Sequence, residues 1–351
     1  MVRRRLSDAE RASAAGTPDA GHTLTDVVGT LVRRDVSTLV VEPRRGPHVE
    51  IAVSDVVAAK EIPPSPSRRD HPHRAISTSD LQEVMNDGWL AEEGHWLGRW
   101  LLRASGGYTK RANSCLTLGA PPGPVEQALD SVRAWYAERN QPALLQVPLP
   151  AGVRASDDDL VRFARSCGWQ ATSPTLVMTA STAYVLESAA REPRATVELS
   201  TGITPTWWHL VDDRTREHES VARALLTRSP ERIFATAFDG GNPVAHARMA
   251  SAQGWGGLFD ITTVPEQRRR GFARSVVEAC ASVARKRDAL SLYLQVSAAN
   301  EGAIELYDRL GFTTHHTYVY LEAPSQDALQ ASALRGLRRP AARTSRASAS
   351  T

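Results

Sequence analysis

One stretch, from Leu258 to Phe312, constrains the fold of this chain more than any other. It opens with an apolar, β-branched run up to Val264, which predicts a buried strand, and Pro265 ends that strand because proline cannot donate the next hydrogen bond of a ladder. From Ala273 onward, apolar residues recur at steps of three and four, which predicts an amphipathic helix that begins near Gly271. The stretch therefore starts as a strand, a tight turn and a helix, in that order.

The turn between this strand and helix has the features of an anion-binding site. Backbone N–H groups at a helix start have no intrahelical partner and point outward with the positive end of the helix dipole. Gly271 lets the backbone approach an anion closely, and the small side chain of Ala273 keeps the next turn open. Arginine side chains add positive charge at positions 268, 269, 270 and 274. The turn therefore predicts a site for a phosphate or a similar anion.

The sequence around this turn differs from the common glycine-rich nucleotide motifs, because the chain contains neither Gly-x-Gly-x-x-Gly nor Gly-x-x-x-x-Gly-Lys-Ser/Thr. Residues 268–273 resemble instead the acetyl-CoA loop of the GNAT N-acetyltransferase superfamily, Arg/Gln-x-x-Gly-x-Gly/Ala. The second half of the GNAT signature is similar as well: Asn300 follows an apolar run, and residues 303–307 lead into the Gly311-Phe312 pair. Both halves occur in order and with ordinary spacing, so the chain is identified as a member of this superfamily.

The resemblance implies an acyltransferase that uses acetyl-CoA as co-substrate and needs no metal. In this family the strand that ends at Val264 and the strand at 290–296 splay apart, which opens a slot for the pantetheine arm and turns the Val264 N–H toward the thioester carbonyl. Tyr307 is then the general acid that protonates the departing thiolate. The residues expected to bind acetyl-CoA are Thr262, Thr263, Val264, Arg268, Arg269, Arg270, Gly271, Phe272, Ala273, Arg274, Asn300 and Tyr307.

The general base is less defined than the acid. Some related enzymes carry a glutamate five residues before the asparagine, where this chain has Gln295, which cannot act as a base. Three candidates remain, namely Asp260, Glu266 and His246. Asp260 is counted with Tyr307 as an expected catalytic residue, and the alternatives stay open.

A second GNAT-like unit precedes this one in the chain. Residues 145–147 parallel residues 294–296, and residues 165–169 parallel residues 309–312 with a small slippage. In the earlier unit the turn at 119–124 contains prolines, which cannot donate amide hydrogen bonds, and no arginine. It also has no counterpart of the tyrosine that serves as general acid. We therefore expect a structural or substrate-shaping role for the earlier unit.

The domain organisation follows from shifts in composition along the 351 residues. Short alternating strands early in the chain predict a small all-β barrel similar to a Src-homology-3 module, which binds either an outside partner or the rest of its own chain. The expected division is a disordered tail at 1–22, this barrel at 23–62, a proline-rich linker at 63–80, the degenerate GNAT-like unit at 81–183, the catalytic GNAT domain at 184–322 and a second disordered tail at 323–351. The predicted fold class is α/β (α+β): tandem GNAT-like mixed sheets flanked by helices and preceded by a small all-β barrel.

Composition argues against several functional classes. A formal net charge of only +3 gives no reason to expect a nucleic-acid or membrane partner. Cys115, Cys167 and Cys280 are odd in number and lie in apolar or helical patterns, which fits reduced thiols in the cytoplasm. His71 and His73 lie in the proline-rich linker without cysteine or carboxylate partners, so we expect them to be solvated and expect no metal site.

The three-part layout also resembles an actinobacterial GNAT family in which some members are named N-acetylglutamate synthases of arginine biosynthesis. This implies a small-molecule amine as acceptor, with glutamate as one candidate. Its two carboxylates would need cationic partners, for which the sequence offers Arg103, Lys110, Arg111 and Arg248. Acetylation of protein amino groups or of an aminoglycoside-like amine, and a non-catalytic acetyl-CoA sensor, stay open as alternatives, and so does a homodimer.

Overall fold

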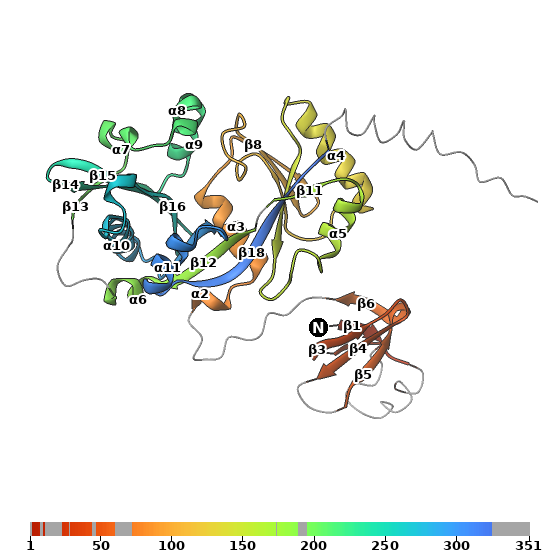
Figure 1. Ribbon diagram of the computed structural model, residues 1–351. Helices are drawn as coiled ribbons and strands as arrows, with labels where there is room; N and C mark the ends of the chain where they lie inside the picture. The colour runs from red at the N-terminus through yellow and green to blue at the C-terminus, as the bar shows by residue number, and fades with distance from the viewer. Residues whose placement is uncertain are drawn as a thin grey trace, which may run out of the picture. The chain divides into compact units, whose positions relative to one another are not determined.

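The structure is a computed structural model that describes residues 2–7, 10, 23–27, 29–43, 47–59, 72–172, 174–188 and 195–324. The chain divides into two compact units, Met1–Arg69 and Asp70–Thr351, each of which is described by itself (Figure 1). None of the helices in these ranges combines the length and apolar character that crossing a membrane requires.

The first unit consists of two small antiparallel sheets, in agreement with the predicted all-β character. Their strand orders are β2-β1-β6 and β3-β4-β5. The elements are β1 (Val2–Arg5), β2 (Leu24–Val27), β3 (Gly29–Arg34), β4 (Thr38–Pro43), β5 (Val49–Ala52), the 3₁₀ turn η1 (Val53–Asp55) and β6 (Val56–Ala59). Val2, Val41 and Ile51 form the buried core of this unit.

Strand β1 differs from the prediction, which assigned residues 1–22 to a tail. Val2–Arg5 pairs with β2 on one side and with β6 on the other. Three of its four residues are arginines, so the sequence carries no apolar pattern that would reveal the strand. Residues 11–22 and 325–351, where the two tails were predicted, lie outside the described residues.

The predicted linker at 63–80 gives way to helices before its expected end. Residues 60–71 lie outside the described ranges, and α2 (Pro72–Ala75) and α3 (Thr78–Gly88) follow. Ser77 caps α3, because its Oγ accepts a hydrogen bond from the Asp80 N–H at 3.1 Å. The prediction that His73 is solvated is wrong: its side chain is buried, and its carbonyl accepts a hydrogen bond from Thr179 Oγ1 at 3.1 Å.

The second unit is built on one 12-stranded sheet. The strand order is β13-β14-β15-β16-β17-β12-β18-β10-β9-β8-β7, with β11 paired to β18 off this path. The strands are β7 (Glu93–Leu97), β8 (Trp100–Ala104), β9 (Cys115–Thr117), β10 (Leu144–Leu149), β11 (Gln170–Ala171), β12 (Thr175–Ser181), β13 (Thr196–Ser200), β14 (Arg232–Asp239), β15 (Asn242–Ala252), β16 (Trp255–Thr263), β17 (Ser291–Ser297) and β18 (Thr313–Glu322).

The two predicted GNAT-like halves exchange their last strands within this sheet. Each half contains one parallel pair, β9 with β10 and β16 with β17. β12, the last strand of the first half, pairs with β17 of the second half, and β18, the last strand of the second half, pairs with β10 of the first. β12 and β18 also pair with each other at the centre of the sheet (Figure 1). The expected boundary at residue 183 therefore divides the sequence but not the sheet.

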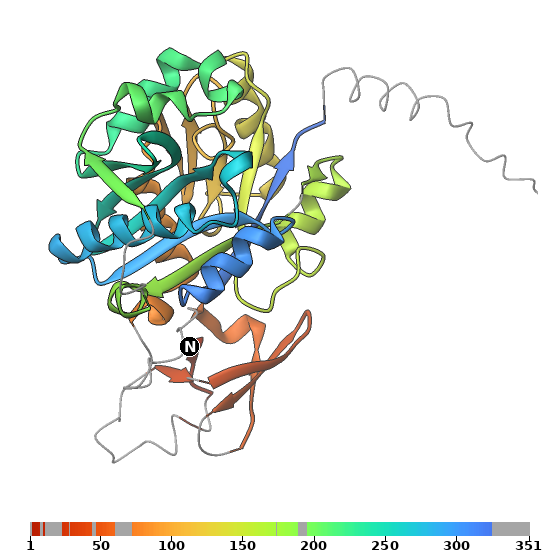
Figure 2. The same cartoon turned by 60° about the vertical axis from the view of Figure 1, so that its left-hand side comes forward.

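Helices cover both faces of the second half. On one face, α10 (Phe272–Lys286) packs with α6 (Thr182–Glu187) and α11 (Glu301–Arg309) over a core that includes Val276, Met249 and Leu292. On the other face lie α3, α7 (Pro205–His209), α8 (Asp213–Glu217) and α9 (Glu219–Arg228) (Figure 2). In the first half, α4 (Val125–Ala137) and α5 (Asp159–Ser166) cover a separate core.

Candidate active site

The candidate site begins where β16 and β17 separate. The two strands pair in parallel from Trp255 opposite Ser291 to Leu258 opposite Leu294, and their pairing stops there. Asp260 follows with a left-handed φ of 53°, at a register shift of β16 against β15. Such a bulge bends its strand. The separation of these two strands, which the family resemblance implies, is therefore present, and the bulge lies where it begins.

The amides that face this slot differ from the predicted one. The Val264 N–H donates to the Val244 carbonyl of β15 at 2.9 Å, so it is not available to a thioester in the slot. Because successive amides of a strand point to opposite sides, the neighbouring Thr263 amide faces away from β15 and toward the slot. The Thr263 carbonyl accepts a hydrogen bond from Arg268 Nε at 3.3 Å. The predicted role of the Val264 amide is therefore wrong, because the amide of the preceding residue, Thr263, is the one that faces the slot.

The turn after β16 has the geometry of an anion-binding helix start. A 3₁₀ turn, η2 (Pro265–Gln267), leads through Gly271, whose φ is 96°, into α10. The first helical bond runs from the Ser275 N–H to the Gly271 carbonyl at 3.1 Å. The N–H groups of Phe272, Ala273 and Arg274 precede this bond and have no intrahelical acceptor. These three amides and the dipole of α10 therefore favour an anion at the turn.

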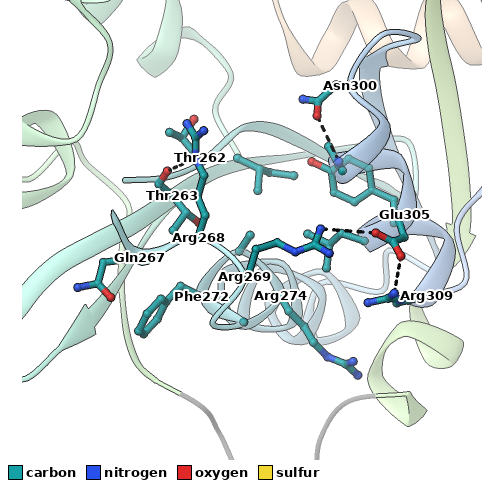
Figure 3. A pocket seen from close by; sticks show the side chains of 17 residues that line it. Thr262, Thr263, Gln267, Arg268, Arg269, Phe272, Arg274, Asn300, Glu305 and Arg309 are labelled. Carbon is teal, nitrogen blue, oxygen red and sulfur yellow. Dashed lines mark hydrogen bonds and ion pairs between the residues drawn. The ribbon is translucent and has the colours of Figure 1, made fainter. Parts of the chain in front are cut away.

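A cavity of about 630 Å³ extends from this turn to α11 (Figure 3). Its cationic lining is partly neutralised, because Glu305 pairs with Arg309 and lies 3.5 Å from Arg269. The lining residues are Ile261, Thr262, Thr263, Gln267, Arg268, Arg269, Gly271, Phe272, Ala273, Arg274, Asn300, Gly302, Ala303, Glu305, Leu306, Tyr307 and Arg309. Most residues predicted to bind acetyl-CoA are thus brought together here.

Two of the predicted acetyl-CoA residues, Val264 and Arg270, do not line this cavity. Arg270 instead pairs with Asp239 at 2.8 Å and also donates a hydrogen bond to Gln267 Oε1. Glu305 and Arg309 do line it, and sequence reasoning missed both. Their spacing of four residues on α11 is that of an ordinary surface ion pair, so nothing in the local pattern indicates that they face a ligand.

A second cavity, of about 490 Å³, joins the first at Tyr307. Both cavities are lined by Ile261, Thr262, Asn300, Ala303 and Tyr307. The remaining lining of the second is Trp89, Tyr108, Thr109, Lys110, Arg111, Asp212, Arg214, Thr215, Leu258, Phe259, Asp260, Gln295, Val296, Ser297 and Tyr320. Residues of both halves of the sheet therefore enclose a space next to Tyr307.

Tyr307 lies on α11 at the junction of the two cavities. Its side chain is 6% exposed, and its ring meets the edge of Phe312 at a centroid distance of 5.9 Å. Burial raises the pKa of the Tyr307 hydroxyl to about 12, so the phenol is protonated at neutral pH. Asn300 caps the same helix, because its Oδ1 accepts a hydrogen bond from the Ala303 N–H at 3.2 Å.

Of the three candidate bases, Asp260 alone lines a cavity described above. Its side chain is 31% exposed, and its Oδ2 lies 3.4 Å from Nε2 of the buried His246. Glu266 lies on η2 with an exposed side chain. The left-handed backbone of Asp260 is rare for a residue other than glycine and marks a site held in place by its surroundings.

A loop of the first half, residues 105–114, forms one wall of the second cavity. Asn113 shapes the loop, because its Oδ1 accepts hydrogen bonds from the Ser105 N–H at 2.7 Å and the Gly107 N–H at 2.9 Å. Lys110 and Arg111, both predicted substrate residues, line the cavity. The Arg111 guanidinium lies over the rings of Trp89 and Phe259, and its buried Nε has no hydrogen-bond partner within the described part of the chain.

Arg103 and Arg248, the other two predicted substrate residues, line neither cavity. Arg103 is buried and donates to the Ser114 carbonyl at 3.1 Å and to Gln146 Oε1 at 2.7 Å. Arg248 is fully buried, with Nε bonded to the Leu226 carbonyl and Nη1 to the Gly88 carbonyl. Burial lowers the pKa of Arg248 to about 10. Both arginines therefore join elements of the core, which corrects their predicted role.

Within the described ranges, no group of three or more His, Cys, Asp or Glu side chains is arranged to hold a metal ion.

Comparison with known proteins gives matches over most of the second unit. A family model described as "Probable histone acetyltransferase Rv0428c C-terminal" matches residues 78–321. The "Probable histone acetyltransferase Rv0428c" of Mycobacterium tuberculosis is 28% identical over 306 residues, which are 86% of this chain and 90% of the relative. The "Uncharacterized N-acetyltransferase YobR" of Bacillus subtilis is 25% identical over 67% of this chain and 96% of its own length. A solved GCN5-related N-acetyltransferase from Kribbella flavida shares the fold, with a TM-score of 0.51 and 15% identity over 72% of this chain and 98% of that one.

Proposed function

The chain belongs to the probable histone acetyltransferase Rv0428c C-terminal family of GNAT acetyltransferases, and from this premise we propose that it transfers the acetyl group of acetyl-CoA to a primary amine held in the second cavity. The observation that carries the proposal is the junction at Tyr307, which lines both cavities. One cavity has the anion-binding turn that a CoA pyrophosphate needs, and the other is open to an acceptor.

The residues of the first cavity fit acetyl-CoA. The free amides of Phe272, Ala273 and Arg274 suit the pyrophosphate, and the Thr263 amide suits a pantetheine arm that pairs with β16 as a further strand would. Arg268 and Arg269 add positive charge beside them. Bound acetyl-CoA supplies an acyl group activated as a thioester.

The side chains around the junction can move the required protons. Asp260 lines the acceptor cavity and would take the proton of an ammonium group, which frees the nitrogen lone pair for attack. Tyr307 stays protonated at neutral pH and would donate its proton to the departing sulfur.

The second cavity favours an amine that also carries an anionic group. Lys110, Arg111 and Arg214 line it, and the buried Nε of Arg111 lacks a hydrogen-bond partner among the described residues. A carboxylate could accept from this group, which supports an amino acid such as glutamate as acceptor. Asp212 and Asp260 in the same cavity support a second candidate, the amino group of a protein, as the name of the Mycobacterium tuberculosis relative suggests for that protein.

The test is thiol release from acetyl-CoA by the purified full-length protein, with a panel of amino acids, amines, histone-type lysine peptides and peptide N-termini. Turnover with acidic amino acids that falls in Arg111→Ala would support the first acceptor class. Turnover with cationic peptides that survives Arg111→Ala would support the second. Tight acetyl-CoA binding without turnover of any amine would overturn the proposed catalysis in favour of a sensor.

A further inference from the structure

We propose that His246 and Asp260 form a proton-sharing pair, in which Asp260 contacts the acceptor amine and His246 acts through it as a buried positioning residue. The proposal rests on the proposed acetyl transfer and adds a group to it. Its geometric basis is the 3.4 Å separation between His246 Nε2 and Asp260 Oδ2.

One proton can be shared between Asp260 Oδ2 and His246 Nε2. Neither ring nitrogen of His246 makes a hydrogen bond with any described residue, although both are buried. A carboxylate and an unprotonated Nε2 have no hydrogen to share, whereas one added proton would join them in a charge-assisted hydrogen bond. Catalytic hydrogen bonds are often long before the substrate arrives and shorten in the complex.

The surroundings hold this pair in position. The His246 side chain is 1% exposed, and its ring packs on Trp207 at a centroid distance of 4.7 Å. Its partners in the ladder are Thr236 on β14 and Thr262 on β16, neither of which carries a charge. Asp260 is fixed from the other side by the bulge in β16, at its left-handed φ of 53°.

Asp260 shares the lining of the second cavity with four charged side chains, Lys110, Arg111, Asp212 and Arg214. Asp260 faces His246 from β16, and Arg248 lies two residues along the same strand as His246. Arg248 and Tyr108 are the groups whose own pKa values respond to the charge of Asp260. Burial raises the pKa of Tyr108 to about 12, so Tyr108 stays neutral at neutral pH.

The proton balance of the step is complete. The acceptor ammonium loses one proton to the Asp260 carboxylate, and that proton is then shared with His246 Nε2. The neutral nitrogen forms the new bond to the acyl carbon as the carbon–sulfur bond breaks, and Tyr307 protonates the sulfur. The new amide nitrogen then loses its second proton, which replaces the proton that Tyr307 gave to the sulfur. Asp260, which is partly exposed, afterwards returns the shared proton to solvent.

The first experiment is a double-mutant cycle on kcat/KM. We expect Asp260→Asn to lower kcat/KM about 100-fold or more and His246→Gln about tenfold. Because His246 acts through Asp260, we expect His246→Gln to cause no further loss in the Asp260→Asn background. Asparagine tolerates the left-handed backbone at position 260, so this variant should fold. Thr236→Val, a buried change beside His246, is the matched packing control and should leave the rate unchanged.

The pH profile separates a proton-sharing role from a packing role. We expect the acidic limb of the wild-type kcat/KM profile to move to lower pH in His246→Gln, because a lone carboxylate binds its proton less strongly than a carboxylate that shares it with an imidazole. The proposal would be overturned if the losses of kcat/KM in the two single variants multiplied in the double variant. It would also be overturned if the acidic limb of the His246→Gln profile stayed unchanged. Either result would leave the proposed acetyl transfer intact.

A second readout needs no acceptor. Nitrogen-15 spectra of the histidine rings, with His246 identified by the signals missing in His246→Gln, report when the ring gains its second proton. We expect the wild-type ring to keep that proton to higher pH than the ring in Asp260→Asn, because the carboxylate stabilises the imidazolium. Equal behaviour in the two proteins would refute the pair even if no acceptor is ever turned over.

Discussion

The hydroxyls of Tyr108 and Thr215 lie 2.9 Å apart and share a hydrogen bond, although 107 positions separate the two residues in the chain. Tyr108 belongs to the first-half loop at 105–114, and Thr215 lies on α8 of the second half. Both line the second cavity. This bond therefore fixes a wall contributed by the degenerate half against the half that carries Tyr307.

Removing this bond should weaken acceptor binding without affecting acetyl-CoA. A buried hydrogen bond contributes about 0.5–1.5 kcal/mol, so we expect Tyr108→Phe to raise the KM for the acceptor about two- to tenfold. Thr215→Val should have the same effect, and the double variant should be no worse than either single one. Steady-state kinetics with each substrate varied in turn measures both constants. A doubled effect in the double variant would show that the two hydroxyls act separately.

Replacement of the general acid should reduce the chemical step alone. We expect Tyr307→Phe to lower kcat about 100-fold, while calorimetry gives an unchanged Kd for acetyl-CoA. Tyr184→Phe, which removes a hydroxyl from a side chain that is 54% exposed, is the control and should behave as the wild type. Full activity of Tyr307→Phe would remove Tyr307 from the mechanism.

The turn should depend on the left-handed backbone of Gly271. We expect Gly271→Ala to lower the free energy of unfolding by about 1–2 kcal/mol and to weaken acetyl-CoA binding at least tenfold, because φ is 96° there. Gly254→Ala is a matched control, because Gly254 has a φ of 76° in a hairpin turn and open space around its Cα. It should show a similar loss of stability with unchanged acetyl-CoA binding, as measured by urea unfolding and calorimetry.

Replacement of the buried Arg248 should lower the stability of the fold. We expect Arg248→Met to lower the free energy of unfolding by about 2–4 kcal/mol, because the carbonyls of Leu226 and Gly88 would lose their donor. The Arg248→Met molecules that remain folded should have the same KM for the acceptor as the wild type. A raised KM with unchanged stability would return Arg248 to the substrate site.

Alkaline conditions should destabilise the fold through its buried tyrosines. Burial raises the pKa of Tyr108 and of Tyr307 to about 12, whereas an unfolded tyrosine titrates near pH 10. Their stabilising contribution is therefore complete below about pH 10 and is lost as the pH rises toward about 12. Urea unfolding at pH 8 and pH 11 measures the change, and Tyr307→Phe should reduce its size. An equal pH dependence in this variant would count against the contribution of Tyr307.

The sequence predicts best where a local pattern fixes the structure. The turn at Gly271 and the helix after it follow from a proline, a glycine and an apolar period of three and four residues, and α10 begins at Phe272. Lys110 and Arg111 are predicted as cationic partners of a carboxylate, and both line the second cavity. The Val264 amide was misassigned by one position, because hydrogen-bond register depends on the neighbouring strand β15.

Tertiary pairing explains the other differences. Arg103 and Arg248 were assigned to the substrate because their charge is visible in the sequence, whereas the carbonyls that bind them come from distant segments. Asp212 and Arg214 belong to a charge run of the kind that usually covers a solvated helix face, yet both line the second cavity. The strand exchange has no local signal, because β12 and β18 would look the same in either half.

The exchange of β12 and β18 also sets an order of completion during synthesis. β18 follows every other strand of its sheet in the sequence, yet it closes the first half against β10. A ribosome-bound chain that has emerged only as far as β17 therefore presents two unpaired edges, on β10 and on β12. The early half cannot finish its sheet until the late half is made, so the two halves must become native together.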